Sequence, residues 1–186
     1  MAERLHERGA RVALAGLEPD LLAQAAAKAG APWWHCDVAD RARVEAAVDA
    51  AVGELGGLDV VVANAGIAAQ LPLVGGDPEV FEQINRVNVL GAYYTLRAAG
   101  PHISHPNGYA VAVSSLGAAV SVPLMGAYST SKAAVEALGN TLRAELAPSG
   151  ARVGVAYFAE LDTDMTSRGF GTEAAKSIFG DGTVTK

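Results

Sequence analysis

The stretch Asp59-Val-Val-Val-Ala-Asn-Ala-Gly66 (DVVVANAG) decides the fold. After Asp59 it is a short apolar, β-branched run, which predicts a buried strand, and a loop that contains Asn64 and Gly66 follows. Helical patterns flank this run at residues 41–55 and 78–99. A strand that is apolar throughout and lies between helices is typical of a parallel sheet covered on both faces.

The same alternation of short strands and longer helices runs along the whole chain. We expect strands at residues 11–15, 33–38, 59–63, 109–114 and 152–157, and helices at residues 2–9, 20–29, 41–55, 78–99 and 127–146. The tail from Thr163 to Lys186 predicts a loop with a short helix. No repeat or linker interrupts the pattern, so we interpret residues 1–186 as one α/β domain.

Composition excludes several classes of protein. Of the 186 residues, 51% are hydrophobic and 18% are charged, which excludes a disordered chain. The net charge of −6 argues against nucleic acid as a partner. The charged N-terminal residues do not resemble a signal peptide, and we expect no membrane span. The single cysteine, Cys36, cannot form an internal disulfide, so we expect a reducing compartment, the cytoplasm.

The segment Tyr128-Ser-Thr-Ser-Lys132 carries the strongest chemical signal. Residues four apart share one face of a helix, so the Lys132 ammonium can lie near the Tyr128 phenol. A nearby cation favours the phenolate form and makes a phenol useful for proton transfer. Alone this spacing is common by chance, but Ser115 ends the predicted strand upstream and Asn88 stands in mid-helix, where asparagine has poor propensity.

Together with Asn64-Ala65-Gly66 and Cys36-Asp37-Val38, these residues resemble the short-chain dehydrogenase/reductase family in its compact form. The resemblance spans residues 2–163. It implies a Rossmann-like, doubly wound parallel sheet with helices on both faces. It also implies an oxidoreductase that transfers hydride reversibly between NAD(P) and a secondary alcohol or ketone.

The resemblance implies a role for each catalytic candidate. Tyr128 corresponds to the general acid/base and Lys132 to the residue that activates it and bonds the nicotinamide ribose. Ser115 corresponds to the serine that orients the substrate oxygen, and strand alternation disfavours Ser114 for this role. Asn88 corresponds to the asparagine that anchors a water in the proton relay.

The resemblance also implies a cofactor site and an oligomer. The cofactor-binding candidates, besides Tyr128 and Lys132, are Asp37, Val38, Asn64, Ala65, Gly66 and Thr163. Gly16 ends the first predicted strand with no adjacent Lys or Arg for a 2′-phosphate, and Glu18 would repel one, so we lean to NAD over NADP. A homodimer or homotetramer would form through the helices at 78–99 and 127–146.

The chain departs from the family pattern at several places. The glycine-rich pyrophosphate loop with the family's first strand, and its last strand, are absent, and Phe158-Ala159 stands where a Pro-Gly pair is usual. We therefore expect these 186 residues alone to bind NAD(H) weakly and to be unstable, and the natural protein to carry an N-terminal extension. The alternative to an enzyme is a noncatalytic fragment or scaffold that retains the dimer helices.

Two further predictions concern ligands. His102 and His105 lie in a predicted loop without cysteine or acidic companions, so we expect no metal site. Apolar residues near Ser115 and Tyr128 either line a pocket for a mainly apolar substrate or pack in the core: Leu116, Val120, Leu124, Met125 and Phe158.

Overall fold

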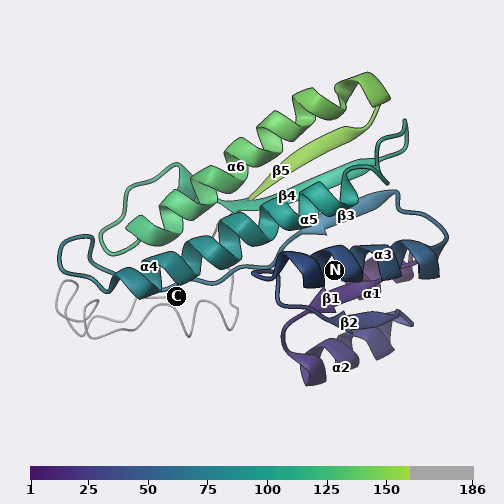
Figure 1. Ribbon diagram of the computed structural model, residues 1–186, viewed down its shortest axis with the longest axis horizontal. Coiled ribbons are helices and arrows are strands. Elements are labelled where there is room, and N and C mark those ends of the chain that lie inside the picture. The colour runs from purple at the N-terminus through teal and green to yellow at the C-terminus, as the bar shows by residue number, and fades with distance from the viewer. Residues whose placement is uncertain (160–186) are drawn as a thin grey trace.

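The structure, a computed structural model, describes residues 1–159 (Figure 1). The helices are α1 (Ala2–His6), α2 (Pro19–Ala29), α3 (Arg41–Leu55), α4 (Pro78–Asn85), α5 (Gly91–Ala99) and α6 (Gly126–Leu146). The strands are β1 (Leu14–Gly16), β2 (Trp33–His35), β3 (Val60–Ala63), β4 (Tyr109–Ser115) and β5 (Arg152–Phe158). Every predicted strand is present, and the expected tail helix lies outside the described residues.

All strand pairs in the described part of the chain are parallel, which confirms the Rossmann-like α/β fold. β3, β4 and β5 form one sheet in the order β3-β4-β5, and β1 and β2 form a second. The strands β1 and β2 pair only from Leu14 with Trp33 to Gly16 with His35, so both are shorter than the sequence predicts. The break between the sheets falls between β1 and β3.

In Figure 1, helices α3, α5 and α6 lie in front of the strands and cover that face of the sheets. Helix α2 packs against β1 and β2. The close approach of α6 to the sheet requires a glycine. A Cβ atom built on Gly139 would lie 2.6 Å from Cγ2 of Val155 and 3.1 Å from Cβ of Ala112. No helix within residues 1–159 is long and apolar enough to cross a membrane.

Arg11 links the segment before β1 to the C-terminal end of α3. Its guanidinium donates hydrogen bonds to the carbonyl oxygens of Leu55 and Glu54, both at 2.7 Å. The last carbonyls of a helix lack partners within the helix and carry its negative dipole end, which makes a cation favourable there. Arg11 therefore fixes the β1 side of the molecule against α3.

The helix predicted at residues 78–99 is not one regular helix. Arg86–Leu90 form a π-helical turn between α4 and α5, and Asn88 lies inside it. A π-turn widens the helix by one residue and is frequent at functional sites. The helix predicted over residues 78–99 is therefore confirmed in its bounds, but periodicity does not reveal the π-turn or the bonds of the Asn88 side chain to backbone groups outside the helix.

Candidate active site

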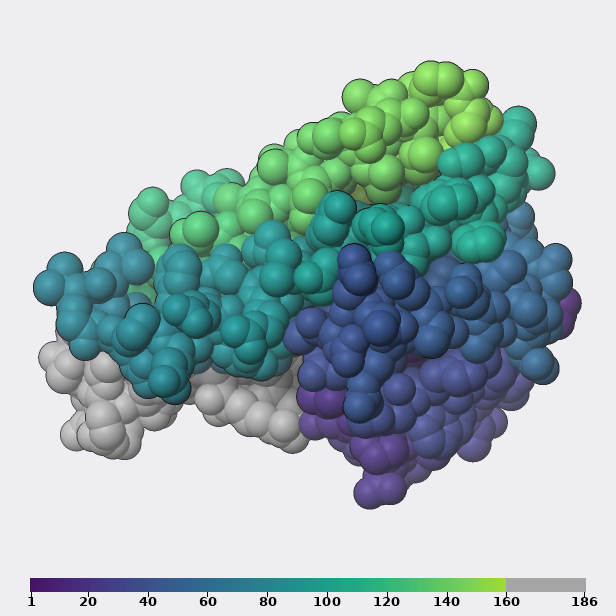
Figure 2. Space-filling model, viewed as in Figure 1, coloured from purple at the N-terminus to yellow at the C-terminus, as the bar shows by residue number. Residues whose placement is uncertain are grey.

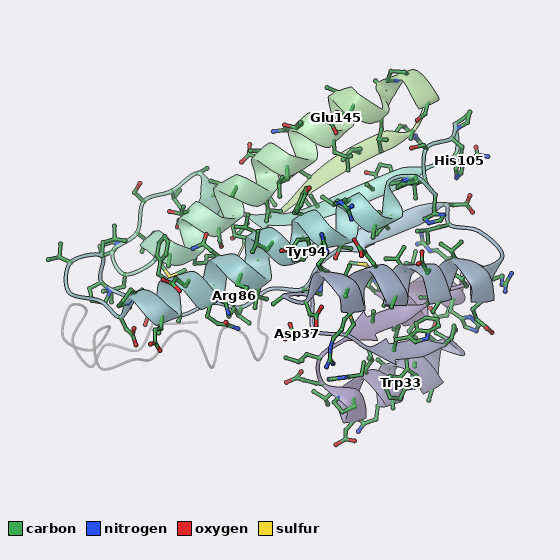
Figure 3. The ribbon with its side chains drawn as sticks, in the orientation of Figure 1. Trp33, Asp37, Arg86, Tyr94, His105 and Glu145 are labelled. Carbon is green, nitrogen blue, oxygen red and sulfur yellow. The ribbon has the colours of Figure 1, made fainter. Side chains whose placement is uncertain are left out.

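The predicted functional residues that the structure describes gather at the carboxyl ends of the strands. Asp37 follows β2, Asn64 follows β3, and Ser115 is the last residue of β4. Figure 3 shows Asp37 and Arg86 toward this end, whereas His105 lies at the opposite end of the sheet. His105 faces the carbonyl oxygen of Leu58 at 3.2 Å and so belongs to the other edge of the molecule.

Tyr128 and Lys132 lie together near the start of α6. The ammonium nitrogen of Lys132 is 5.7 Å from the centroid of the Tyr128 ring. Lys132 is 3% exposed and donates a hydrogen bond to the carbonyl oxygen of Val113 at 3.0 Å. β3 pairs with β4 only as far as Ala63 and Ala112, so this lysine bonds the first β4 carbonyl beyond that pairing.

Burial alters the acid–base behaviour of Lys132. Desolvation lowers the pKa of its ammonium from 10.5 to about 8. Loss of hydration disfavours the charged form of any lysine, and the bond to Val113 compensates only part of it. The fold therefore holds a cation beside the Tyr128 ring at a cost in stability.

Ser115 and Ser114 point to different partners, as strand alternation predicts. The Ser115 hydroxyl accepts a hydrogen bond from the Gly117 amide at 3.1 Å and donates a long one to Phe158 O at 3.4 Å. A Cβ atom on Gly117 would lie 3.4 Å from both Oγ of Ser115 and Cε1 of Tyr128, so these two side chains flank one small space. Ser114 is buried and donates to Lys132 O at 2.9 Å, which holds the α6 backbone.

Asn88 is fully buried and pairs with the backbone of Ile67 in the loop after β3. Its Oδ1 accepts from the Ile67 amide at 2.7 Å, and its Nδ2 donates to the Ile67 carbonyl at 2.9 Å. This two-way pairing ties the π-turn to the loop. The side chains of Asn88 and Lys132 both lie beside Gly66. A Cβ atom added there would be 3.1 Å from Asn88 Oδ1 and 3.4 Å from Lys132 Nζ.

The residues predicted to hold the adenosine side of a cofactor lie at the same edge. Asp37 is partly buried, and its Oδ1 accepts from the Ala39 amide at 2.9 Å. Val38 packs against Gly91, since a Cβ there would meet Val38 Cγ2 at 2.7 Å. Asn64 and Ala65 are exposed directly after β3.

Thr163 lies outside the described residues. The nicotinamide contact that the resemblance implies for it remains a prediction.

The donor set fits a dinucleotide. Lys132 has three N–H groups and uses one on Val113, which leaves two for ribose hydroxyls. Gly66 keeps open the space beside this ammonium that any larger side chain would fill. Asp37 offers a carboxylate acceptor at the edge where nucleotides bind in doubly wound sheets.

Ser131 belongs to this site although it is not among the residues that the sequence predicts to be functional. Its hydroxyl donates to Tyr128 O at 2.7 Å and accepts from Asn88 Nδ2 at 2.9 Å. The available signal was its position three residues after Tyr128, on the same helix face. The bond to Asn88 joins residues 43 apart in sequence, so only the tertiary structure reveals it.

The apolar residues around the site separate into two groups. Leu116, Val120 and Phe158 are exposed, as a substrate-facing lining requires, and Met125 is partly buried. Leu124 is buried at 7% exposure, so it belongs to the packing interpretation. Its φ of 68° is unusual for a side chain-bearing residue, and its carbonyl accepts from the Leu71 amide at 2.8 Å.

A separate hollow of about 580 Å³ lies beside α4 and contains none of the four catalytic candidates. It is lined by Ile67, Ala69, Asp77, Glu79, Val80, Glu82, Gln83, Ile84 and Arg86. Within residues 1–159 no cluster of three or more His, Cys, Asp or Glu side chains is arranged to hold a metal ion.

A family model described as enoyl-(acyl carrier protein) reductase matches residues 1–182. The chain is 33% identical over 180 residues to 2-(R)-hydroxypropyl-CoM dehydrogenase of Xanthobacter autotrophicus, an alignment that covers 89% of this chain and 70% of that protein. The chain belongs to the short-chain dehydrogenase/reductase family. Within this family it is also 39% identical over 116 residues to L-2,3-butanediol dehydrogenase of Corynebacterium glutamicum, covering 61% of this chain and 45% of the relative.

Solved structures of short-chain dehydrogenases/reductases share the fold. The 3-ketoacyl-(acyl-carrier-protein) reductase of Brucella melitensis, complexed with NADH, superposes with a TM-score of 0.86 at 28% identity, covering 91% of this chain and 73% of that one. The present chain thus spans between about half and about three quarters of the length of the relatives compared.

The buried ammonium predicts a pH-dependent gain in stability when Lys132 is replaced. At pH values below both the folded pKa of about 8 and the unfolded value of 10.5, the desolvation cost is fully present. The difference between the two pKa values corresponds to a desolvation cost of about 3 kcal/mol in the free energy of folding. We expect Lys132→Met to raise the free energy of unfolding near neutral pH by about 2 kcal/mol, since the lost bond to Val113 offsets about 1 kcal/mol.

Urea unfolding at neutral pH and at about pH 10 measures this difference. The advantage of Lys132→Met should shrink as pH rises through the folded pKa, because the wild-type lysine then folds uncharged. Lys28→Met, at an exposed lysine of α2, is the matched control and should change little at either pH. A stability difference for Lys132→Met that does not depend on pH would contradict the assignment.

Proposed function

We propose that this protein is an NAD(P)-dependent oxidoreductase that interconverts a secondary alcohol and a ketone. The observation that carries the proposal is the gathering of the Ser115 hydroxyl, the Tyr128 phenol and the Lys132 ammonium at the carboxyl end of β4. Relatives named as dehydrogenases and a neighbour complexed with NADH support the same reaction type and a nicotinamide cofactor.

In the proposed reaction Tyr128 exchanges a proton with the substrate oxygen. Ser115 donates a hydrogen bond to the same oxygen, and its long contact to Phe158 O is easily exchanged for this one. Lys132 stabilises the phenolate that forms during proton transfer, because its ammonium lies beside the ring in a site with little water. Asn88 orders the loop after β3, and in the relay that the resemblance implies it anchors a water.

The cofactor site uses the same edge. Lys132 would bond the nicotinamide ribose, Asp37 the adenine amino group, and Val38, Asn64, Ala65 and Gly66 would line the adenosine side. The nicotinamide supplies the hydride acceptor or donor. Thr163 is proposed for the carboxamide from the resemblance.

A noncatalytic scaffold is the less favoured alternative. A scaffold would not need a buried lysine that costs stability, a serine at the end of β4 and a phenol flanking the same space. The exposed Leu116, Val120 and Phe158 support a mainly apolar ketone or alcohol as substrate.

The first test is Tyr128→Phe, assayed with saturating nicotinamide cofactor and a panel of uncharged secondary alcohols and ketones beside charged keto acids. We expect kcat to fall by on the order of a hundredfold or more, because the proton donor is lost while the ring remains. Tyr109→Phe, at the amino end of β4, is the matched control and should keep wild-type activity. Wild-type turnover in Tyr128→Phe, or turnover of charged keto acids alone, would refute the respective part of the proposal.

We further propose NAD over NADP as cofactor. Gly16 carries no side chain that could bond a 2′-phosphate, and the next residue, Leu17, is exposed. We expect a higher kcat/KM with NAD, and a rise of on the order of tenfold with NADP in Leu17→Arg, since a guanidinium pairs well with phosphate. Leu21→Arg, at an exposed position of α2, should not change the preference. A wild-type preference for NADP would overturn the assignment.

We also propose a homodimer or homotetramer through residues 78–99 and 127–146. Figure 2 shows α4, α5 and α6 side by side on one face. The segments 78–99 and 127–146 carry exposed apolar side chains at Leu90, Tyr93, Ala133 and Ala137. We expect Ala137→Arg to shift the protein toward monomer in sedimentation velocity, because a long charged side chain prevents close helix packing. Ala25→Arg, at an exposed alanine of α2, should leave the assembly intact; a monomeric wild-type protein would contradict the proposal.

The cytoplasm is the compartment that we propose. Cys36 is a free, buried thiol, and burial together with the Asp37 and Asp40 carboxylates raises its pKa and keeps it protonated.

A further inference from the structure

Ser131 is a fully buried hydroxyl in the interior of α6, directly before Lys132. Serine is a weak helix former, and a buried hydroxyl lowers stability unless it is hydrogen-bonded. Here it makes two bonds, one to its own helix and one to another. It donates to Tyr128 O and accepts from Asn88 Nδ2.

The bond from Asn88 Nδ2 to Ser131 gives the last N–H group of the Asn88 side chain a partner. The Asn88 oxygen accepts from the Ile67 amide, one N–H donates to the Ile67 carbonyl, and Ser131 takes the other. Without the Ser131 hydroxyl one buried N–H would have no partner, which is costly. The Asn88 side chain would then be bonded to the Ile67 backbone alone, and we expect the π-turn to shift relative to α6.

The second bond acts on the catalytic turn itself. Tyr128 O lies at the start of the turn that carries the phenol, and Lys132 lies at its end. Ser114 holds that end from β4 by donating to Lys132 O. Ser131 connects the Tyr128 end of the turn to Asn88. Two serines with no proposed role in proton transfer, Ser131 and Ser114, therefore fix the two ends of the turn.

We infer that Ser131 is a positioning residue for the proposed reaction, which sets the Tyr128–Lys132 turn against Asn88 through its two hydrogen bonds. This inference rests on the proposed function. Because Ser131 touches neither substrate nor cofactor in this role, its loss should lower the rate of the chemical step and leave binding almost unchanged. Small displacements of an acid/base group reduce the rate strongly.

The chain offers a matched control two residues away. The Ser129 hydroxyl is also buried but makes no hydrogen bond within residues 1–159. Ser131→Ala should lower kcat by on the order of tenfold to a hundredfold with KM for substrate and cofactor within about twofold. Ser129→Ala should keep wild-type kcat, and Ser131→Thr, which retains the hydroxyl, should recover most of the lost rate.

Equal kcat for Ser131→Ala and Ser129→Ala would overturn the inference. So would a folded Ser131→Thr that is no faster than Ser131→Ala. Thermal unfolding of all three variants separates misfolding from a loss of rate. If Tyr128→Phe keeps full activity while Ser131→Ala loses it, the proposed acid/base fails and the positioning role fails with it.

A readout that needs no turnover distinguishes the two proposals. The Asn88 side-chain amide resonance in an NMR spectrum of the ¹⁵N-labelled protein should shift in Ser131→Ala and stay in place in Ser129→Ala. If the Asn88 resonance is unchanged in Ser131→Ala while the wild-type protein shows normal turnover, the positioning role of Ser131 is refuted and the proposed function is not. Absence of any wild-type oxidoreductase activity would refute the proposed function, even where the resonance shifts.

Discussion

The two-way pairing between the Asn88 amide and the Ile67 backbone is the interaction on which the site depends. It joins the loop after β3 to a π-turn in the middle of a long helix, and Ser131 extends the connection to α6. A buried asparagine with all of its side-chain groups bonded cannot rotate without losing hydrogen bonds that water does not replace. Three segments far apart in sequence are thereby held in one geometry around Gly66.

Beside this network, the burial of a charged side chain lowers the stability of the protein. Lys132 is desolvated beside the Tyr128 ring, its pKa lowered to about 8, with one carbonyl as its fixed partner among the described residues. A methionine there would avoid the desolvation of an ammonium but could not take either role that we propose for Lys132, the bond to a ribose hydroxyl and the stabilisation of a phenolate. Conflicts between stability and local chemistry of this kind are common at functional sites.

The sheet shows a related division. β4 is paired on both sides, by β3 and β5, whereas within residues 1–159 β1 and β2 pair only with each other. Contacts between α3 and α5 and the two bonds from Arg11 to the end of α3 connect the halves. Asp37 and Val38, which follow β2, therefore depend on helix packing for their position relative to the catalytic side, whereas Asn64, Ala65 and Gly66 follow β3 in the same sheet as β4.

The sequence by itself determined the element order, the parallel α/β class and the identity of the residues at the strand ends, because apolar periodicity and local spacing are written in neighbouring residues. It also predicted that Ser114 and Ser115 face different ways. The π-turn at Asn88, the role of Ser131, the burial of Lys132 and Leu124 and the division of the sheet were decided only by the tertiary structure. Each depends on contacts between residues distant in sequence, such as Asn88 with Ser131 or Lys132 with Val113, which no local pattern encodes.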